Sequence, residues 1–291
     1  MRSGAAMTLA AILFISVMIN LANYPGEIDD ESPLSNTGES SNLPPDWSYC
    51  IDPICRTTAE NFNDVAISSN GDFIVAGSEK NLNGGEIFFF IKHSEVPFRE
   101  YETGVDVASV DISDNGDYFV AVAESYIVYL FEKTSSTPLW TFDAYRESKI
   151  AISGNGEYII VGTADGHNSR IHLFSMSSNS PIWSYTAGGD IRTVAISDDG
   201  EYITAGGNSG MVYIFNNNSG TPLHAYNAGG DVLSVSISGN GHGIVVGSIN
   251  GIHKLFSEDV GIAAQSFNRL NIIWVTTTGH EVNKVEISKD G

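Results

Sequence analysis

Short stretches of alternating apolar and polar residues recur along the chain, and each is followed by a turn sequence. The pattern occurs six times, from DVAISSNGDF at residue 64 to VEISKDG at residue 285. In every copy Ser follows a central Ile, and Gly lies three residues after that Ser. Alternation with period two predicts a strand, and the Asn-Gly or Asp-Gly pair supplies the positive φ of a tight turn. The central residues are Ile67, Ile112, Ile152, Ile196, Ile237 and Ile287.

A second and a third strand are predicted after each of the first five turns. The second strand starts with an aromatic residue in four units, namely Phe73, Tyr118, Tyr158 and Tyr202. It ends in small residues such as Ala76-Gly77, which let neighbouring backbones approach closely. The third strand is predicted over residues 86–90, 127–131, 170–174, 211–215 and 252–256.

A fourth strand is predicted around the residue that lies nine positions after the last Phe of the third strand. These residues are Arg99, Trp140, Trp183 and His224. In the fifth unit Trp274 follows Phe256 by 18 residues, which predicts an insertion of nine. Trp47 lies in a phrase like those of the fourth strands, so we expect it to donate an outer strand to the last blade of a ring.

Four short strands in each unit, without helical periodicity, predict an all-β fold: a β-propeller of four-stranded blades. A blade buries its faces only by stacking on its neighbours. The chain contains five units and the start of a sixth. Because a propeller removes its sheet edges by closing its ring, we expect six or more blades in the complete chain, with this sequence C-terminally incomplete.

The N-terminal residues differ in composition from the repeats. Arg2 precedes an apolar run from Ala5 to Ala22, an arrangement typical of a signal peptide or a short signal anchor. Residues 25–46 contain six acids and no base, which predicts a flexible acidic linker. The expected organisation is a signal peptide or signal anchor over 1–24, the linker over 25–46 and the propeller over 47–291. We therefore expect an extracytoplasmic protein, secreted or anchored to the membrane by its N-terminal segment.

The chain is strongly acidic, with 14 Lys or Arg against 35 Asp or Glu and a net charge of −21. Such a chain repels polyanions, and no basic stripe offsets the charge, so nucleic acid is excluded as a general partner. Docking on an anionic membrane surface through charge is excluded for the same reason. Membrane contact is expected only through the N-terminal segment.

Two cysteines and one sequon are the candidate modification sites. In an exported protein, a pair of nearby cysteines such as Cys50 and Cys55 predicts a disulfide. Metal binding is disfavoured there, because two Cys without a nearby His form an incomplete ligand set. Asn217 begins an Asn-Asn-Ser sequon between a third and a fourth strand, and it is a candidate glycosylation site.

No catalytic, cofactor or metal site is expected from the sequence. The acids of two turns could gather oxygens for calcium, but their spacing does not match an EF-hand loop, and solvated turns explain them better. They are Asp111, Asp114, Asp117, Asp198, Asp199 and Glu201. His172 and His253 lie in third strands and His224 lies at the Trp position, so packing explains them. The recurrent Trp and Tyr of the fourth strands are likewise expected in the core.

The repeats resemble the blades of WD40 proteins. The phrase VAISDDGEYITAGGNSGMVYIF of the fourth unit follows that family's order of strand, Asp-Gly turn, strand and strand. The Trp-Asp pair of the family is replaced by Phe131-Glu132, Phe174-Ser175 and Phe215-Asn216, which puts its hydrogen-bonded tetrad in doubt here. The repeats also resemble PQQ-type quinoprotein propellers, because Gly210-Met211-Val212-Tyr213 precedes Ser219-Gly220.

The WD40 resemblance implies a non-catalytic scaffold that binds proteins or a ligand on its rim or on one face. The quinoprotein resemblance implies two alternatives, a dehydrogenase or a propeller of envelope assembly. Catalytic quinoproteins are much longer and carry an adjacent Cys-Cys pair, which Cys50 and Cys55 do not form. We therefore expect a binding scaffold with protein partners and no cofactor, and we do not expect an enzyme.

Overall fold

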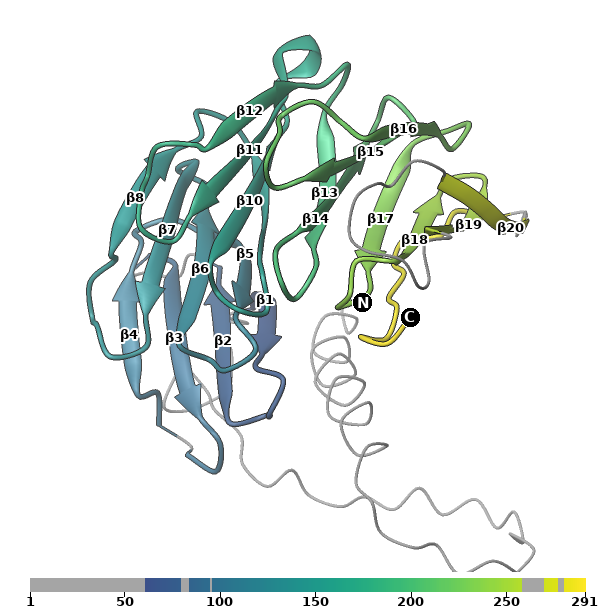
Figure 1. Cartoon of the computed structure of the whole chain (residues 1–291). Coiled ribbons are helices and arrows are strands. Elements are labelled where there is room, and N and C mark those ends of the chain that lie inside the picture. Colours follow the sequence, from purple (N-terminus) through teal and green to yellow (C-terminus); the bar gives the residue numbers. More distant parts are fainter. Residues whose placement is uncertain (1–60, 80–83, 95, 258–269, 277–279) are drawn as a thin grey trace, which may run out of the picture.

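The computed structural model describes residues 61–79, 84–94, 96–257, 270–276 and 280–291. These residues form five antiparallel sheets of four strands each (Figure 1). Each repeat unit of the sequence forms one sheet, and within each sheet the strands are paired in chain order. The predicted all-β fold of four-stranded propeller blades is therefore confirmed.

The strands lie close to their predicted positions. Blade 1 contains β1 (Phe62–Ile67), β2 (Phe73–Ser78), β3 (Glu86–Ile91) and β4 (Arg99–Glu102). Blade 2 contains β5 (Val107–Ile112), β6 (Tyr118–Ala123), β7 (Ile127–Glu132) and β8 (Trp140–Asp143). Blade 3 contains β9 (Ser148–Ile152), β10 (Tyr158–Thr163), β11 (Arg170–Ser175) and β12 (Trp183–Thr186), with a 3-10 turn η1 (Gly166–Asn168). Blade 4 contains β13 (Ile191–Ile196), β14 (Tyr202–Gly207), β15 (Met211–Asn216) and β16 (His224–Asn227), and blade 5 contains β17 (Val232–Ile237), β18 (Gly243–Ser248), β19 (Gly251–Ser257) and β20 (Leu270–Thr276).

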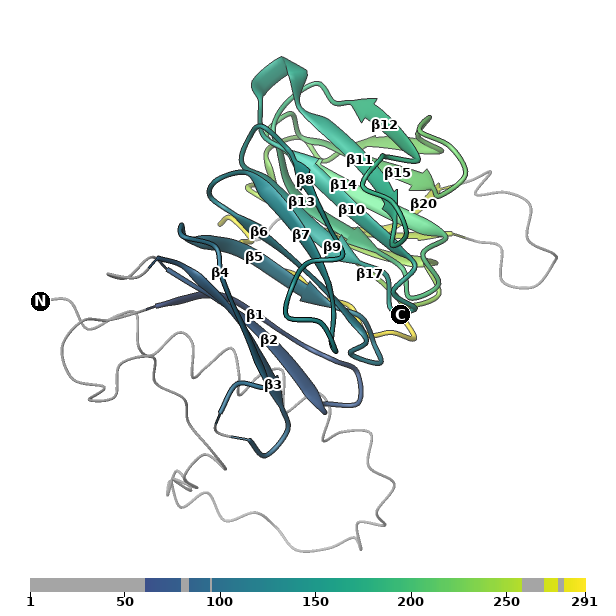
Figure 2. The ribbon, with the colours of Figure 1, turned by 90° about the vertical axis from the view of Figure 1, so that its left-hand side faces the viewer.

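The blades are arranged in an arc around a common centre. Their first strands, β1, β5, β9, β13 and β17, surround this centre, and each contacts the next (Figure 1). Figure 2 shows the same sheets from the side, where blade 1 packs face to face on blade 2. The first strands therefore form the inner wall of the ring, and the fourth strands lie at its periphery.

The recurrent Ser and Gly build the turn between the first and second strands. In blade 3, Ser153 Oγ donates a hydrogen bond to Asn155 Oδ1 (2.6 Å) and accepts one from Tyr158 N (3.0 Å), while Gly156 has a φ of 75°. A Ser side chain thus closes each turn from inside, and Gly supplies the left-handed backbone. The same contacts occur around Ser68, Ser113, Ser197 and Ser238.

The turn Gly of one blade also receives the aromatic side chain of the preceding blade. The ring of Phe73 in blade 1 lies against Gly116 in blade 2, and a Cβ at Gly116 would overlap that ring. Tyr118, Tyr158 and Tyr202 meet the turn Gly of blades 3, 4 and 5 in the same way. The repeat therefore requires Gly for two reasons, the positive φ and the contact between blades.

The small residues at the ends of the second strands make room for side chains of the next blade. A Cβ at Gly77 would overlap Val107, which begins β5, and a Cβ at Gly162 would overlap Ile191, which begins β13. The small residues allow a close approach at these positions, but the prediction that backbones approach one another is wrong there. The approach brings a β-branched side chain, rather than a neighbouring backbone, against the Gly.

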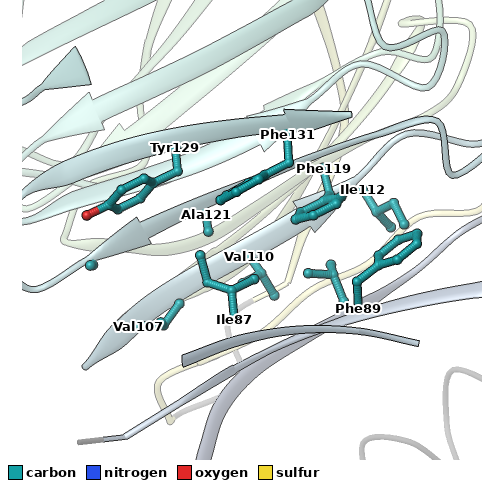
Figure 3. Close-up of a cluster of buried hydrophobic side chains, with 11 residues drawn as sticks. Ile87, Phe89, Val107, Val110, Ile112, Phe119, Ala121, Tyr129 and Phe131 are labelled. Atoms are coloured by element: carbon teal, nitrogen blue, oxygen red, sulfur yellow. The ribbon is translucent and has the colours of Figure 1, made fainter. Parts of the chain in front are cut away.

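The hydrophobic core lies between adjacent blades. Figure 3 shows the cluster between blades 1 and 2, in which Phe119 stacks between Phe89 and Phe131 with both ring centroids 4.9 Å away. All three rings are almost completely buried. Burying a Phe side chain stabilises a fold by about 1.5–3 kcal/mol, so this stacked aromatic row is a main source of cohesion between blades 1 and 2.

The register of blade 5 corrects the predicted insertion. Ile244 pairs with Leu255, whereas the equivalent residue of blade 4, Ile203, pairs with Phe215. Leu255 therefore occupies the position that the sequence pattern gave to Phe256. Trp274 pairs with Lys254 and so lies at the expected Trp position, but it follows Leu255 by 19 residues, which makes the insertion ten.

Residues 280–291 form the start of the predicted sixth unit beside β17. Val285 N donates to Ser234 Oγ (3.1 Å) and Ile287 N donates to Ser236 Oγ (3.2 Å). The turn is present as well, because Gly291 N donates to Ser288 O (3.0 Å). This segment therefore packs on blade 5 as the first strand of a further blade packs on its predecessor.

The expectations for residues 1–60 lie outside the described residues. They are the signal peptide or anchor over 1–24, the linker over 25–46, the outer strand at Trp47 and the disulfide between Cys50 and Cys55. Among the residues that the structure describes, no helix has the length and apolarity needed to cross a membrane.

Candidate binding surfaces

The meander of each blade creates two faces of the ring. The first face contains the connections from first to second and from third to fourth strands, and we name it the Lys289 face. The second contains the connections from second to third strands and from each fourth strand to the next blade, and we name it the Tyr126 face. In propellers, loops on a rigid scaffold are the usual carriers of function.

Six equivalent turn positions meet near the centre of the Lys289 face. Successive turns are joined by backbone hydrogen bonds, for example from Asp114 N to Gly154 O (2.9 Å) and from Gly239 N to Lys289 O (2.9 Å). Lys289 Nζ lies 2.6 Å from Asp114 Oδ2 and 3.1 Å from Asp198 Oδ2. The positions are Ser69, Asp114, Gly154, Asp198, Gly239 and Lys289. One lysine thus neutralises two acids of different blades.

Polar side chains on the inner wall accept hydrogen bonds from backbone N–H groups of the first strand in the next blade. Asp64 Oδ2 accepts from Val110 N (2.9 Å), and Asp111 Oδ2 accepts from Ile152 N (2.8 Å). Burial raises the pKa of Asp111 to about 7, although the hydrogen bonds from Ile152 N and Ile112 N act in the opposite direction. These acids hold adjacent blades together. In the sequence, the only sign of this role is that each is a polar residue within an apolar strand.

The histidines of the third strands are packing residues, as predicted. His172 is buried, with Nδ1 2.8 Å from Ser184 Oγ, and burial lowers its pKa to about 4. His253 is buried with Nδ1 2.8 Å from the hydroxyl of Tyr226, and burial also lowers its pKa. Both rings are therefore neutral at neutral pH. They also pack between blades, because His172 contacts the ring of Phe142 in blade 2 and His253 contacts the ring of Tyr226 in blade 4.

The aromatic residues of the fourth strands pack on the next blade, which confirms the expected core role. Trp183 stacks on Phe215 with ring centroids 5.0 Å apart, and its Nε1 donates to Asn217 O (2.8 Å). Trp140 packs on Phe174 in a tilted arrangement with ring centroids 5.6 Å apart, and its Nε1 donates to Met176 O (2.9 Å).

Arg99 lies at the Trp position of blade 1 and packs differently. Its guanidinium carbon lies 4.2 Å from the ring centroid of Phe98, and its Nη1 donates to Phe98 O (3.0 Å). Its Nε is buried without a hydrogen-bond partner. A small cavity between blades 1 and 2 is lined by Arg99, Phe119 and Phe131. Arg99 therefore fills this position less well than Trp fills it in blades 2 and 3.

The acids that could suggest calcium have other partners, and the two that converge, Asp114 and Asp198, do so on the ammonium of Lys289. Asp117 pairs with Lys133 (2.5 Å), Asp114 and Asp198 bind Lys289, and Asp199 accepts from Ser197 Oγ (2.6 Å). Within the described part of the chain, no group of three or more His, Cys, Asp or Glu is arranged to hold a metal. Asn217, the candidate glycosylation site, lies half-buried in the connection between β15 and β16.

The Tyr126 face carries two tyrosines that the sequence analysis missed. Tyr126 connects β6 to β7 and Tyr145 connects β8 to β9, and Ala144 N donates to Tyr126 O (2.9 Å). Tyr126 is 40% exposed and Tyr145 is 73% exposed. Their φ angles are 67° and 60°, in the left-handed region that bulky residues rarely adopt. Both could have been found by aligning the turns with those of blade 4, which has Gly210 and Gly229 at these positions.

A family comparison matches one repeat of this ring. Residues 179–216, from the end of blade 3 through β15, match the family model described as WD domain, G-beta repeat. The repeats form a WD40-like β-propeller. The other resemblance, to quinoprotein propellers, stays a prediction that no finding tests.

Solved structures support the WD40-like fold. A chain of the structure titled "Crystal Structure of Mitotic Checkpoint Complex" aligns with a TM-score of 0.65 at 16% identity, covering 80% of this chain and 72% of that chain. The β-propeller domain of Cps50 (Swd1) from Myceliophteria thermophila aligns with a TM-score of 0.62 at 12% identity, covering 75% and 72%. A comparison with curated proteins found no match. At these identities the structural likeness establishes the fold alone.

Proposed function

We propose that the protein is a non-catalytic scaffold that binds other proteins through the loops of its WD40-like propeller. The observation that carries this proposal is the pairing of a rigid ring with exposed aromatic residues in strained loop positions, Tyr126 and Tyr145. Exposed aromatic residues are common anchors of protein interfaces. One of the similar structures is part of a mitotic checkpoint complex, so this fold acts there within a multiprotein assembly.

We also propose that the N-terminal apolar segment exports the propeller and, where it is retained, tethers it to the membrane. Support comes from the sequence, in which Arg2 and the run from Ala5 to Ala22 precede the acidic residues 25–46. Protease treatment of intact cells that carry a C-terminally tagged full chain tests this. Cleavage of the tag from outside is expected, and a fully protected tag in intact cells would overturn the proposal.

The scaffold proposal is tested by cross-linking the tagged full chain in its native source and determining the composition of the purified complexes. A small set of proteins in fixed stoichiometry is expected. Recovery of the chain alone, or turnover by a dye-linked dehydrogenase assay after addition of quinone, would count against a scaffold and in favour of the enzyme alternative.

A further inference from the structure

We propose that Tyr126 and Tyr145 anchor a basic polypeptide segment, rich in Arg or Lys, on the Tyr126 face between blades 2 and 3. This inference deepens the proposed scaffold function and rests on it. It names the surface used and the chemical class of the partner.

The two tyrosines stand where blade 4 has glycine. In blade 4 the same backbone contact runs from Ala228 N to Gly210 O (2.8 Å), and Gly210 and Gly229 have φ angles of 72° and 79°. Gly210 is thus equivalent to Tyr126, and Gly229 is equivalent to Tyr145. Blade 2 holds large exposed rings at positions where Gly would cost less backbone energy. Packing does not require the ring of Tyr145, since 73% of the residue is exposed.

The charge around the tyrosines selects a cationic partner. Glu124 and Glu147 are exposed in the same two connections, and Asp143 is exposed at the end of β8 beside them. The cation of these connections, Arg146, is held by Asp165 through Nε at 2.7 Å. Exposed carboxylates and exposed tyrosine rings are both groups that attract an Arg or Lys side chain, the carboxylates by charge and the rings by cation–π interaction.

Other classes of occupant are disfavoured by the same charges. A second copy of this chain carries a net charge of −21 and would be repelled. Nucleic acid and anionic lipid surfaces are repelled for the same reason. A basic segment of another protein is the occupant that fits both the aromatic rings and the acids around them.

Peptide binding to the full chain tests this inference. The probes are fluorescein-labelled peptides of alternating Arg and Gly, with a peptide of alternating Glu and Gly as the control. We expect saturable binding of the Arg peptide that weakens with salt, and no binding of the Glu peptide. The double variant Tyr126→Gly/Tyr145→Gly should bind the Arg peptide at least about tenfold more weakly.

The matched control is His93→Gly. His93 is exposed on the Lys289 face with a φ of 64°, so this change relieves the same kind of backbone strain away from the tyrosines. Its affinity for the Arg peptide should equal that of the wild type. Tyr145→Gly should unfold at a temperature no lower than the wild type, which separates loss of binding from loss of fold. If the double Gly variant does not fold, Tyr126→Asn/Tyr145→Asn removes the rings with a residue that tolerates the left-handed region.

Equal affinity of the wild type and a folded ring-deletion variant for the Arg peptide would overturn the inference, because attraction would then come from net charge alone. The scaffold proposal fails by a different result. If cross-linking recovers partners that the double variant still binds, the scaffold stands and this surface is wrong. If it recovers no partner while the peptide binds through the tyrosines, the surface stands and the scaffold proposal fails.

Discussion

Lys289 Nζ lies 2.6 Å from Asp114 Oδ2, although the two residues belong to the sixth and the second repeat units. The same ammonium lies 3.1 Å from Asp198 Oδ2 in the fourth unit. Partial burial lowers the pKa of Lys289, but hydrogen bonds and attraction from the two carboxylates outweigh it, so the pKa is raised. The contact therefore links three units across the centre of the Lys289 face.

The variant Lys289→Met should lower the free energy of unfolding by about 0.5–1 kcal/mol, because the side chains of all three residues are partly exposed and water screens the attraction. The loss should shrink at high salt. Urea unfolding at low and high salt measures both effects. Lys284→Met is the control, since Lys284 pairs within its own segment, with Glu286. An equal loss in the two variants, or a loss independent of salt, would contradict the account.

Gly116→Ala should be more destabilising than Gly71→Ala. Both glycines have a φ of 70°, so both variants incur backbone strain of about 1 kcal/mol. A Cβ at Gly116 also overlaps the ring of Phe73, whereas a Cβ at Gly71 meets nothing within 4 Å. Overpacking adds about 1–3 kcal/mol at Gly116 only. Chemical denaturation of both variants measures the difference, and equal losses would refute the contact between blades.

Asp111 should make the folded protein less stable as the pH rises. Its pKa is raised by burial to about 7, above the ordinary value of 3.8, so its protonated form favours the folded state. That contribution is complete below about pH 4 and is lost between pH 4 and 7. Because Asp111 is partly exposed, water reduces the effect, and we expect the free energy of unfolding to fall by about 1–3 kcal/mol over this range. Asp111→Asn should remove this dependence and Glu100→Gln, on an exposed strand, should keep it. If the free energy of unfolding varied with pH in the same way in the wild type and in Asp111→Asn, Asp111 would not titrate in this pH range.

Arg99→Trp should raise the free energy of unfolding by about 1 kcal/mol. Trp would remove the unpaired buried Nε of Arg99 and fill the space against Phe131, as Trp140 fills the equivalent space against Phe174. The reverse change in the next blade, Trp140→Arg, should cost about 2–4 kcal/mol. Thermal unfolding of the two variants tests the comparison, and a destabilised Arg99→Trp would show that the two positions are not equivalent.

The periodic pattern predicts most of the fold, because each repeat specifies its own strands and turn. The central Ile residues, the turn glycines and the starting aromatics all lie where the pattern places them. The sequence does not indicate why Ser follows each Ile, since closing a turn with a hydroxyl depends on backbone geometry. It also misplaces the Phe position of blade 5, because Leu255 and Phe256 are both apolar and only the strand register separates them.

The candidate surfaces are less predictable, because they depend on contacts between units. Lys289 meets Asp114 only when the turns of six units are brought to one centre. The connections that carry Tyr126 and Tyr145 are brought together by the hydrogen bond from Ala144 N to Tyr126 O. An exposed Tyr in a turn is unremarkable in sequence, and its meaning depends on a φ that only the structure supplies.

Photo-cross-linking on the two faces tests most directly whether this propeller binds a protein partner through the Tyr126 face. A photoreactive phenylalanine analogue replaces Glu124 on the Tyr126 face in one variant and Lys92 on the Lys289 face in the other, both exposed positions. Irradiation of the native source should give a discrete adduct with a basic protein from position 124 and none from position 92. Equal labelling at both positions, or no adduct at position 124, would contradict the account.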